Sequence, residues 1–576
     1  MSEQDEDELD EEQRAAVEAT EHAIAVLAGP GSGKTRTLSH RARHLLRTDS
    51  GSKALLLTFT NKAAAEMKAR AVGVAAVSSD RIDASTFHGF GVRILRAHGP
   101  LVGVPKDFEI LDEHEADDLA KSVARSLGTA NRAVAWQHSR LRRQKPSTEV
   151  AAFGAAYQEA KSREAVVDFD DLIVLPAELL QTHEAVAQAY GRRYPHVLVD
   201  EFQDTNAAQF EIIRALCAHV STVSVFADDD QAIFGFVGAE TANIRSFIEQ
   251  LGAREYPLTC NYRCRGAIVA AANRLIAANP GFSGRQMRAH KPDGIVDLRV
   301  YDTVSDEAYQ LAQDIEHRLA SVSPTSVSVL VRAGYRADEL VAALRGRGIP
   351  ITDWRGEIFG LAERRDFATA MSALRGTLNE RRASRLSALI GVEASTGEDS
   401  TQRYLEGLAG NPVADELLRL RELAFDGGTP SQLAAQAQVA IAAADAAAAG
   451  RVQHLVDAVA DFERYDSEFS VDDLLAELAL GSGGRAPTEG GGVRIASLHK
   501  TKGLQWPIVY ALGLEEGHMP DYRADEEDLP EERRTCFVGV CRAEDELILT
   551  FARRFRTHQR KPSRFLGELG VIDRRG

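Results

Sequence analysis

A glycine-rich octapeptide constrains the fold of this chain more than any other stretch. Ala28 to Thr35 reads AGPGSGKT, follows an apolar run from Ala23 to Leu27, and precedes a segment over 35–46 with the residue pattern of a helix. Glycines let a backbone curl so that successive N–H groups point at one centre, which suits phosphate oxygens. Strand, loop and helix in this order predict a site for a nucleoside triphosphate at the edge of a parallel sheet.

The other residue types of the loop support this interpretation. We expect Lys34 to place a positive charge near the β and γ phosphates, and the hydroxyl of Thr35 to ligate Mg²⁺. The expected nucleotide-binding residues of the loop are Ala28, Gly29, Gly31, Ser32, Gly33, Lys34 and Thr35.

A second motif supplies the acidic groups that phosphoryl transfer needs. Asp200 to Thr205 reads DEFQDT and follows a β-branched run over His196 to Val199. A parallel strand that ends there delivers two carboxylates to the edge of the sheet where the phosphate loop lies. Asp200 would hold Mg²⁺ through water, and Glu201 would polarise the attacking water. The alternative is a solvated acidic turn.

Composition sets the frame for these motifs. The chain has 576 residues, which predicts two to four domains, and its hydrophobic content of 44% is typical of globular proteins. No apolar run is long enough to span a bilayer, and the first residues are acidic, unlike a signal peptide, so we expect a cytoplasmic protein without a membrane partner.

Charge and cysteine content leave two alternatives open. The net charge is −17, yet residues 140–145 (RLRRQK) and 551–564 (FARRFRTHQRKPSR) are basic, either as solvated faces or as contacts to a polyanion. Five cysteines argue against a disulfide framework; they are Cys217, Cys260, Cys264, Cys536 and Cys541. A four-thiolate metal site built from the last four is an alternative to their packing as small hydrophobic residues.

Short apolar strands alternate with amphipathic helical stretches over two long regions. Ala54 to Thr58 is followed by a helical pattern from Asn61, and a second such rhythm begins near Val296 and resumes at Val493 to Ser497. This alternation predicts two α/β domains with parallel sheets. Helical insertions without strand patterns interrupt both, and an alanine-rich run in the second is expected to be plain helix.

The motifs in their order resemble the helicase motifs of the UvrD/Rep family of superfamily 1. From residue 9 to about 568 they read LDEEQRAAV, AGPGSGKTR, LTFTNKAAAEMKAR, STFHGF, DFDDL, LVDEFQDTN, DDDQAIFGFVGA, LTCNYR, SLHKTKGLQWP, LGLEEGHMP and EERRTCFVGVCRAEDEL. The resemblance implies an α/β fold of two RecA-like P-loop NTPase domains, each with parallel strands, flanking helices and a mainly α-helical inserted domain. The first domain is expected over 1–91 and 166–258 with insertion 92–165, the second over 259–376 and 489–576 with a short insertion 377–488.

The resemblance also implies roles for single residues around the nucleotide. Gln13 matches the glutamine that reads adenine, Arg36 and Tyr262 match the pair that sandwiches its ring, and Gln505 stands where a glutamate normally meets the ribose. The expected catalytic set is Lys34, Asp200, Glu201, Gln231, Arg263 and Arg542. Because the two arginines belong to the second domain, ATP is expected in the cleft between the domains, so that its hydrolysis would open and close the cleft.

Single-stranded DNA is expected to cross both domains. The positions that match this track combine aromatic faces, which stack on bases of any sequence, with hydroxyl, amide and basic groups. They are Phe59, Asn61, Thr86, His88, Phe169, Phe234, Phe236, His499, Lys502 and His558. For any one of the aromatic residues, packing in the core is the alternative.

Four positions depart from the family pattern. Phe236 and Val237 stand in place of a tryptophan and an arginine, Gln505 in place of a glutamate, and Cys541 in place of a threonine. We expect a weaker grip on DNA or a softened nucleotide preference, with ATPase activity retained.

The resemblance implies an ATP- and Mg²⁺-dependent motor that moves 3′ to 5′ on single-stranded DNA and separates duplexes at single-strand/double-strand junctions, in repair, replication or recombination. The direction comes from the resemblance alone. One alternative is a DNA-stimulated ATPase subunit of an antiphage or nuclease-coupled complex, in which a partner protein cuts the DNA. Another is a nucleotide-gated DNA-binding switch that unwinds nothing.

Overall fold

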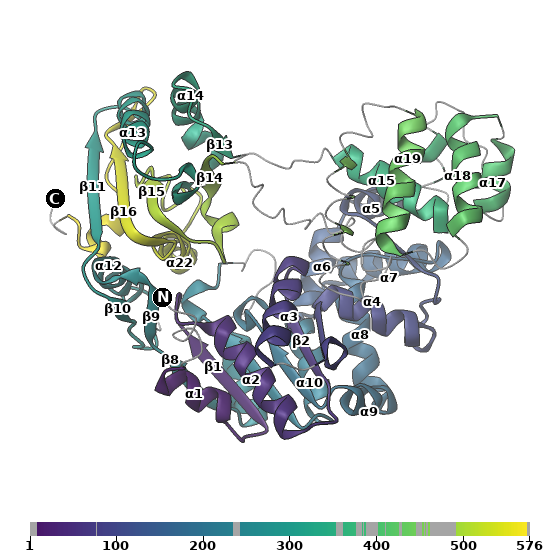
Figure 1. The fold of residues 1–576 in the computed structure, drawn as a ribbon. Coiled ribbons are helices and arrows are strands. Elements are labelled where there is room, and N and C mark those ends of the chain that lie inside the picture. Colours follow the sequence, from purple (N-terminus) through teal and green to yellow (C-terminus); the bar gives the residue numbers. More distant parts are fainter. Residues whose placement is uncertain are drawn as a thin grey trace.

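Two six-stranded parallel sheets form the framework of the molecule in the computed structural model (Figure 1). The structure describes residues 9–75, 78–233, 242–280, 282–352, 361–375 and 491–572, together with parts of 383–463. In Figure 1 the second sheet stands above the first. A helical unit that includes residues 361–375, 412–424 and 430–444 lies beside the second sheet, above the helices of the first insertion. Within the described ranges, no helix combines the length and apolar character needed to cross a membrane.

The first sheet runs in the order β3-β2-β6-β7-β1-β8. Its strands, in that order, are Ile82–Thr86, Ala54–Thr58, His196–Val199, Thr222–Ala227, Ala23–Ala28 and Arg254–Leu258. The central strands are nearly continuous apolar runs because helices cover both faces. Alternate residues serve opposite faces, since Ile24 and Val26 belong to one buried cluster and Ala25 to another.

Helices that precede and follow the phosphate loop in the chain cover the two faces of this sheet. On the Ile24 face lie α1 (Glu11–Glu18), α2 (Lys34–Thr48) and α3 (Asn61–Ala75). On the opposite face lie α4 (Phe87–His98), α8 (Asp171–Thr182), α9 (Glu184–Arg193), α10 (Ala207–Cys217) and α11 (Ala242–Leu251). The first insertion adds α5 (Glu113–Ser126), α6 (Ala133–Leu141) and α7 (Thr148–Arg163), and its ends meet in a short pair of strands, β4 (Glu109–Ile110) and β5 (Val166–Val167).

The second sheet runs in the order β11-β16-β15-β12-β14-β13 and is also parallel throughout. Its strands, in that order, are Ile295–Tyr301, Ala543–Ala552, Trp506–Leu512, Val327–Val331, Val493–Ser497 and Ile351–Thr352. One face packs on α13 (Val304–Arg318) and α14 (Asp338–Gly346), and the other on α12 (Gly266–Ile276), α22 (Leu529–Val540) and α23 (Arg564–Leu569). Two short pairs complete the unit, β9 (Cys260–Arg265) with β10 (Arg288–Lys291) and β17 (Arg554–Phe555) with β18 (His558–Gln559).

The α/β class with two parallel sheets is confirmed, and β2, β6 and β14 begin and end at the predicted residues. Two helices bear on the expected domain boundaries, and one of them crosses a boundary. Helix α4 starts five residues before the expected boundary at 92 and runs through it. Helix α15 (Leu361–Arg375), expected with the second sheet, packs instead on α18 (Pro412–Ala424) and α19 (Pro430–Ala444) beside α17 (Thr401–Gly407). Helix α15 therefore shares a buried cluster with helices of the region expected as the second insertion.

Candidate nucleotide site and nucleic-acid interface

The phosphate loop leaves the carboxyl end of β1 and enters α2 at the same sheet edge where β6 and β7 end. Strand β7 lies between β1 and β6, so that Asp200 after β6 and Asp228 after β7 follow neighbouring parallel strands. This sheet edge is where α/β folds bind ligands, because the loops that follow parallel strands gather there.

Glycine is required in the loop by both conformation and space. Gly31 and Gly33 have positive φ values of 70° and 78°, which side chains rarely adopt. A Cβ at Gly33 would lie 2.6 Å from Nε2 of Gln13, and one at Gly31 would lie 2.6 Å from Cβ of Arg263. Because it has no side chain, Gly33 leaves room for Gln13, the candidate that reads adenine. Gly31 likewise leaves room for Arg263 of the second sheet unit.

Lys34 lies between the two carboxylates of the DEFQDT motif. Its Nζ is 2.6 Å from Oε1 of Glu201 and 3.6 Å from Oδ1 of Asp200. Burial opposes charge at Lys34, but the two carboxylates raise its pKa above the usual value. Burial also disfavours the charged carboxylates and raises the pKa of Asp200, whereas Lys34 and Lys502 lower the pKa of Glu201 to about 2. Glu201 is thus held ionised beside the loop.

Gln13 is placed at the phosphate loop by a capping box. Asp10 caps α1 and accepts the main-chain N–H of Gln13 at 2.7 Å, while Oε1 of Gln13 accepts the N–H of Asp10. Nε2 of Gln13 donates to the carbonyl of Ser32 at 2.9 Å, and the side chain is buried. An amide has two donors and two lone pairs, so one of each remains for a base.

The strand that carries the first candidate arginine lies directly on the phosphate loop. The N–H of Tyr262 donates to the carbonyl of Gly31 at 2.8 Å, and Nδ2 of Asn261 donates to the carbonyl of Pro30 at 2.8 Å. The hydroxyl of Tyr262 donates to Asp10, at the start of the helix that bears Gln13. Tyr262 of the second sheet unit therefore contacts the start of the helix that carries Gln13, across the seam between the two sheet units. Arg36 lies in the first turn of α2, just after Thr35.

The second candidate arginine contacts the first sheet unit directly. Nη2 of Arg542 donates to Oε1 of Gln231 at 2.9 Å, and Nε2 of Gln231 donates to Oδ2 of Asp228 at 2.5 Å. Nε of Arg542 donates to the carbonyl of Val538 at 2.9 Å, and Nη1 donates to the carbonyls of Leu504 at 3.1 Å and Thr501 at 3.5 Å. Burial, together with Arg263 nearby, lowers the pKa of Arg542 to about 10, so that it remains a cation at neutral pH.

Two buried polar atoms test whether the site fits a triphosphate. Oγ of Ser32, in the loop, is buried and has no hydrogen-bond partner among the described residues, and the same holds for Nε of Arg263. Buried polar groups in proteins are almost always satisfied. A hydroxyl within the loop and a guanidinium N–H beside it, both with spare donor capacity, match the chemistry of phosphate oxygens.

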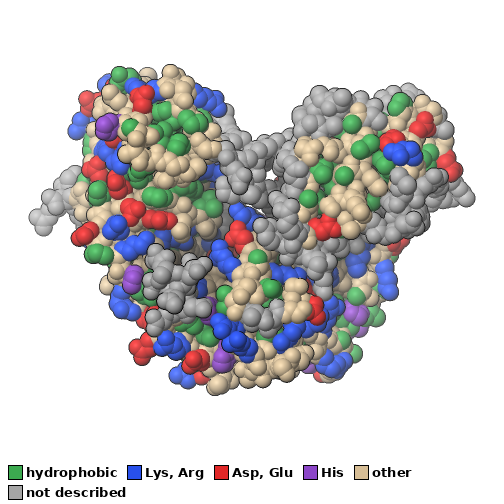
Figure 2. All heavy atoms as spheres, in the orientation of Figure 1, with side chains coloured by type: hydrophobic (Ala, Val, Ile, Leu, Met, Phe, Trp, Pro, Cys, Tyr) green, Lys and Arg blue, Asp and Glu red, His purple; other side chains and the backbone are tan. Residues whose placement is uncertain are grey.

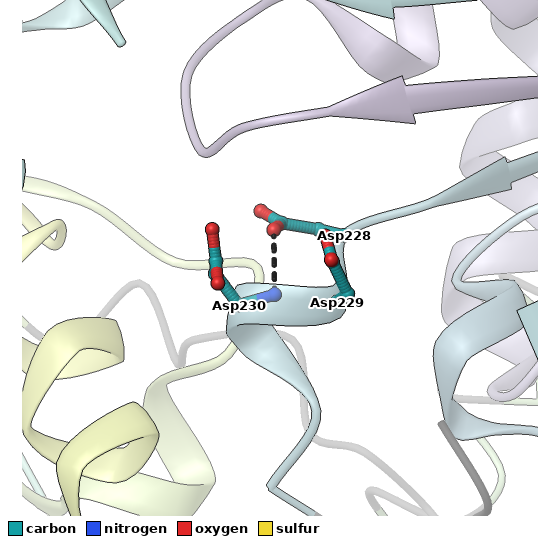
Figure 3. Close-up of side chains that lie close together, drawn as sticks. All are labelled: Asp228, Asp229 and Asp230. Atoms are coloured by element: carbon teal, nitrogen blue, oxygen red, sulfur yellow. Dashed lines mark hydrogen bonds between the residues drawn. The ribbon is translucent and has the colours of Figure 1, made fainter. Parts of the chain in front are cut away.

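Three consecutive aspartates gather after β7. Their carboxylates at Asp228, Asp229 and Asp230 lie within 4.8 Å of one another, and Asp228 accepts the N–H of Asp230 at 3.2 Å (Figure 3). Burial and mutual repulsion raise the pKa of Asp230 to about 8, and burial raises that of Asp228 to about 6. Arg285 of the second unit pairs with Asp229. Across the part of the chain that the structure describes, this is the one cluster of metal-ligating types found.

The cysteines lie in other surroundings. Cys264, Cys536 and Cys541 are buried in the core of the second unit, and Sγ of Cys264 donates to the carbonyl of Cys541 at 3.6 Å. They serve there as small hydrophobic residues, and two of them, Cys264 and Cys541, adjoin Arg263 and Arg542 in the chain.

Several predicted DNA contacts lie along the first unit beyond the phosphate loop. Phe59 is half-buried, with its ring centroid 5.8 Å from that of Phe87, and His88 meets Phe169 edge-on at 6.1 Å. Burial lowers the pKa of His88 to about 4, so it is neutral at physiological pH. Thr86 is buried, and its hydroxyl accepts the N–H of Gly89 as the cap of α4. Asn61 opens α3.

The remaining predicted contacts fall in different settings. Phe234, Phe236 and Val237 lie outside the described residues. His558 is exposed in the β17–β18 hairpin, His499 is half-buried, and Gln505 is exposed.

Lys502 lies in the seam between the two units. Its Nζ donates to Oδ2 of Asp204 at 2.5 Å and to the carbonyl of Gln231 at 3.0 Å.

Three contacts across the seam could not be predicted from the sequence: Asn261 on Pro30, Arg285 on Asp229, and Arg534 on the carbonyl of Ala232. The same holds for the contact of Gln231 with Asp228 within the first unit. Asn261 and Asp228 lie inside motifs that had been recognised. Only their partners could not be read from the sequence.

The basic clusters are partly paired. Arg140 pairs with Asp171, Arg143 with Glu211, and Arg564 with Glu516. Figure 2 shows Lys and Arg side chains gathered over the first sheet unit on the face drawn, with acidic side chains interspersed. The uneven distribution leaves basic surface available despite the net charge of −17.

Comparison with known proteins gives matches along almost the whole chain. Residues 9–252 match the UvrD/REP helicase N-terminal domain, and residues 256–411 and 431–554 match the UvrD-like helicase C-terminal domain. Relatives include DNA helicase II of Salmonella typhimurium (31% identical, covering 98% of this chain and 87% of the relative) and of Escherichia coli (30%, with the same coverage). ATP-dependent DNA helicase PcrA of Staphylococcus aureus is 28% identical, covering 97% of this chain and 86% of the relative.

Proposed function

The chain belongs to the UvrD/Rep helicase family, and we propose that it is an ATP-dependent DNA helicase that moves 3′ to 5′ along single-stranded DNA and separates duplexes at single-strand/double-strand junctions. The observation that carries the proposal is the contact of Arg542 with Gln231. It brings a cation of the second sheet unit to the catalytic edge of the first, so that the ATP site is composed of both.

ATP is the substrate of this composite site. Its phosphates would lie in the loop of Gly31 and Gly33, with Lys34 moving its charge from Glu201 to the β and γ phosphates. Thr35 and Asp200 would hold Mg²⁺, which neutralises phosphate charge when bound. Relieved of Lys34, Glu201 regains basicity and orients the attacking water. Arg263 and Arg542 stabilise the charge that develops on the transferring group.

The same arrangement ties hydrolysis to movement. A γ-phosphate between the units would add its charge to the contacts that already join them, by drawing in Arg263 and Arg542, so its loss favours opening of the seam. A strand that crosses both units would be gripped alternately by each. Stacking on aromatic side chains such as Phe59 and Phe169 would give affinity for bases of any sequence, at roughly 1–3 kcal/mol per base.

The family relationship further supports a role in repair, replication or recombination, with protein partners that remain to be identified. DNA as substrate and five free cysteines fit the cytoplasm.

Strand separation on tailed duplexes tests the proposal. With ATP and Mg²⁺, we expect the protein to separate a duplex with a 3′ single-stranded tail and to leave one with a 5′ tail largely intact. Preference for the 5′ tail would overturn the direction. DNA-stimulated hydrolysis without separation of either duplex would favour an ATPase subunit that works with a nuclease, and slow hydrolysis with no stimulation would favour a DNA-binding switch.

A further inference from the structure

A buried ion cluster joins the first insertion to the first sheet unit. Its cations, Arg140 of α6 and Lys161 of α7, come from the insertion, and its carboxylates, Asp168 and Asp171, lie just before and at the start of α8. The side chains of Lys161 and Asp171 are only 2% and 1% exposed. Because burying charge is costly, an ion cluster of this kind contributes little net stability. We therefore expect it to define a geometry.

The two carboxylates close a ring of hydrogen bonds around Phe169. Oδ1 of Asp168 accepts the main-chain N–H of Asp171 at 3.0 Å, and Oδ2 of Asp171 accepts the main-chain N–H of Asp168 at 3.1 Å. Phe169 and Asp170 are the two residues between them. Reciprocal hydrogen bonds of this type restrict the backbone of the residues that they enclose.

Lys161 holds the two carboxylates together. Its Nζ donates to Oδ2 of Asp168 and to Oδ2 of Asp171, each at 2.5 Å. Without this cation, two buried carboxylates that now share one ammonium would repel each other. The insertion also binds the other oxygen of Asp171, which accepts from Nε2 of Gln158 at 3.2 Å and lies 2.8 Å from Nη1 of Arg140.

Phe169 is held at its backbone and at its ring. Its carbonyl accepts the N–H of Leu172 at 3.2 Å, in the first turn of α8. Its half-buried ring meets that of His88, from α4, edge-on with the centroids 6.1 Å apart. Stacking on a base depends on the orientation of such a ring, because the aromatic face and the base must lie against each other.

We propose that Lys161 is a positioning residue for Phe169: by bridging Asp168 and Asp171, it fixes the ring of Phe169 in the orientation that stacks on a DNA base. The proposal rests on the proposed function, because the family resemblance assigns Phe169 to the DNA track. The cation comes from the insertion and the ring from the first sheet unit. Docking of the insertion therefore completes one base-stacking position of the first unit.

The first test compares DNA affinity with the rate of hydrolysis. In Lys161→Met, we expect the affinity for a single-stranded oligonucleotide without nucleotide to fall about 5- to 50-fold, as loss of one stacked base would cause. Its dependence on salt should not change, because no phosphate contact is lost, and kcat at saturating DNA should stay within about twofold of wild type. Lys121→Met is the matched control, because it removes the same charge from an exposed ion pair of the same insertion. Its affinity for DNA should equal that of wild type.

A double-mutant cycle links Lys161 to the ring. If Lys161 acts through Phe169, adding Lys161→Met to Phe169→Ala causes no further loss of DNA affinity, and Lys161→Arg weakens binding less than Lys161→Met. Thermal unfolding of each variant establishes that it is folded. Should Lys161→Met fail to fold, Asp168→Asn takes its place in the cycle, and the same non-additivity is expected.

A tryptophan reporter tests the position of the ring in the absence of DNA. In the Phe169→Trp background, Lys161→Met should increase the quenching of tryptophan fluorescence by acrylamide, because the ring is released from its fixed orientation. The increase should exceed the change that Lys161→Met causes with Phe169 intact, which accounts for the other tryptophans of the chain.

Three results would overturn the inference. One is additive loss of DNA affinity in the cycle. Another is a lower thermal stability of Lys161→Met with unchanged DNA affinity, which identifies a structural role alone. The third is a salt slope smaller by about 0.7 in Lys161→Met, which identifies a phosphate contact. Failure of wild type to bind single-stranded DNA would instead count against the proposed function, and the tryptophan reporter would still test the position of the ring.

Discussion

Each sheet unit places a cation at the seam between the units, but the two cations differ in whether carboxylates balance their charge. In the first unit Lys34 is paired with two carboxylates, which raise its pKa. In the second unit the hydrogen-bond partners of Arg542 are all neutral oxygens, and burial lowers its pKa to about 10. One cation is compensated and the other is not. We propose that this difference lets the first unit bind phosphate and the second respond to it.

The largest effect is expected for the compensated cation. Lys34→Met removes the charge that binds the β and γ phosphates and leaves Asp200 and Glu201 without their buried partner. We expect steady-state ATP hydrolysis to fall by at least about 10³-fold. The free energy of unfolding in urea should fall by about 3 kcal/mol, because breaking a buried ion pair leaves uncompensated charge. Turnover at even a tenth of the wild-type rate would contradict the assignment of the loop.

Substitution of Arg542, the uncompensated cation, should lower the rate of ATP hydrolysis without lowering the stability of the fold. Arg542→Met removes the charge expected to stabilise the transferring phosphoryl group, so kcat should fall by about 10³-fold. Because no carboxylate is left unpaired, stability in urea should be unchanged or higher. The control is Arg533→Met in the same segment, where loss of the pair with Glu568 should lower stability and leave kcat near wild type. A destabilised Arg542→Met would mean that the two cations do not differ as described.

A smaller effect is expected on the proposed DNA track. Phe59→Ala should leave basal hydrolysis near wild type and weaken single-stranded DNA binding by roughly 1–3 kcal/mol, as loss of one stacked base would. The measurement is the DNA concentration that gives half-maximal stimulation of hydrolysis. If the variant unfolds at much lower temperature, with unchanged DNA dependence, packing against Phe87 is the main role of Phe59.

The smallest effect is a dependence of stability on pH. Burial lowers the pKa of His88 from 6.5 to about 4. Between these values the unfolded chain binds a proton that the folded protein does not, so the contribution of neutral His88 is complete above pH 6.5 and is lost as pH falls towards 4. In urea titrations, wild type should lose more stability than His88→Asn over this window. Parallel curves would show that His88 is solvated.

Much of this comparison could be predicted from the sequence, because local patterns specify local structure. The glycines of the phosphate loop, the β-branched strand before Asp200, and the order of the motifs predicted the fold and its catalytic edge. The partners across the seam could not be predicted. The resemblance predicts a DNA contact for Lys502, and nothing in a one-dimensional pattern states that its ammonium contacts Asp204, almost 300 residues away.

The packing partner of helix α15 is a further contact that the sequence does not specify. The amphipathic pattern of α15 shows that one face is buried but does not say against which partner. Its apolar residues pack with α18 and α19 rather than on the second sheet. The unit to which a helix near a boundary belongs is decided by its tertiary contacts. The sequence of the helix alone does not specify these contacts.

The rate of ATP hydrolysis as a function of single-stranded DNA concentration tests the central claim most directly. If the two units form one site and DNA draws them together, hydrolysis rises severalfold to a plateau as the oligonucleotide is added. The affinity for DNA then also differs between the nucleotide-free protein and the protein with a non-hydrolysable ATP analogue, as reciprocal linkage requires. A rate that does not change with DNA, together with no measurable DNA binding, would contradict the account.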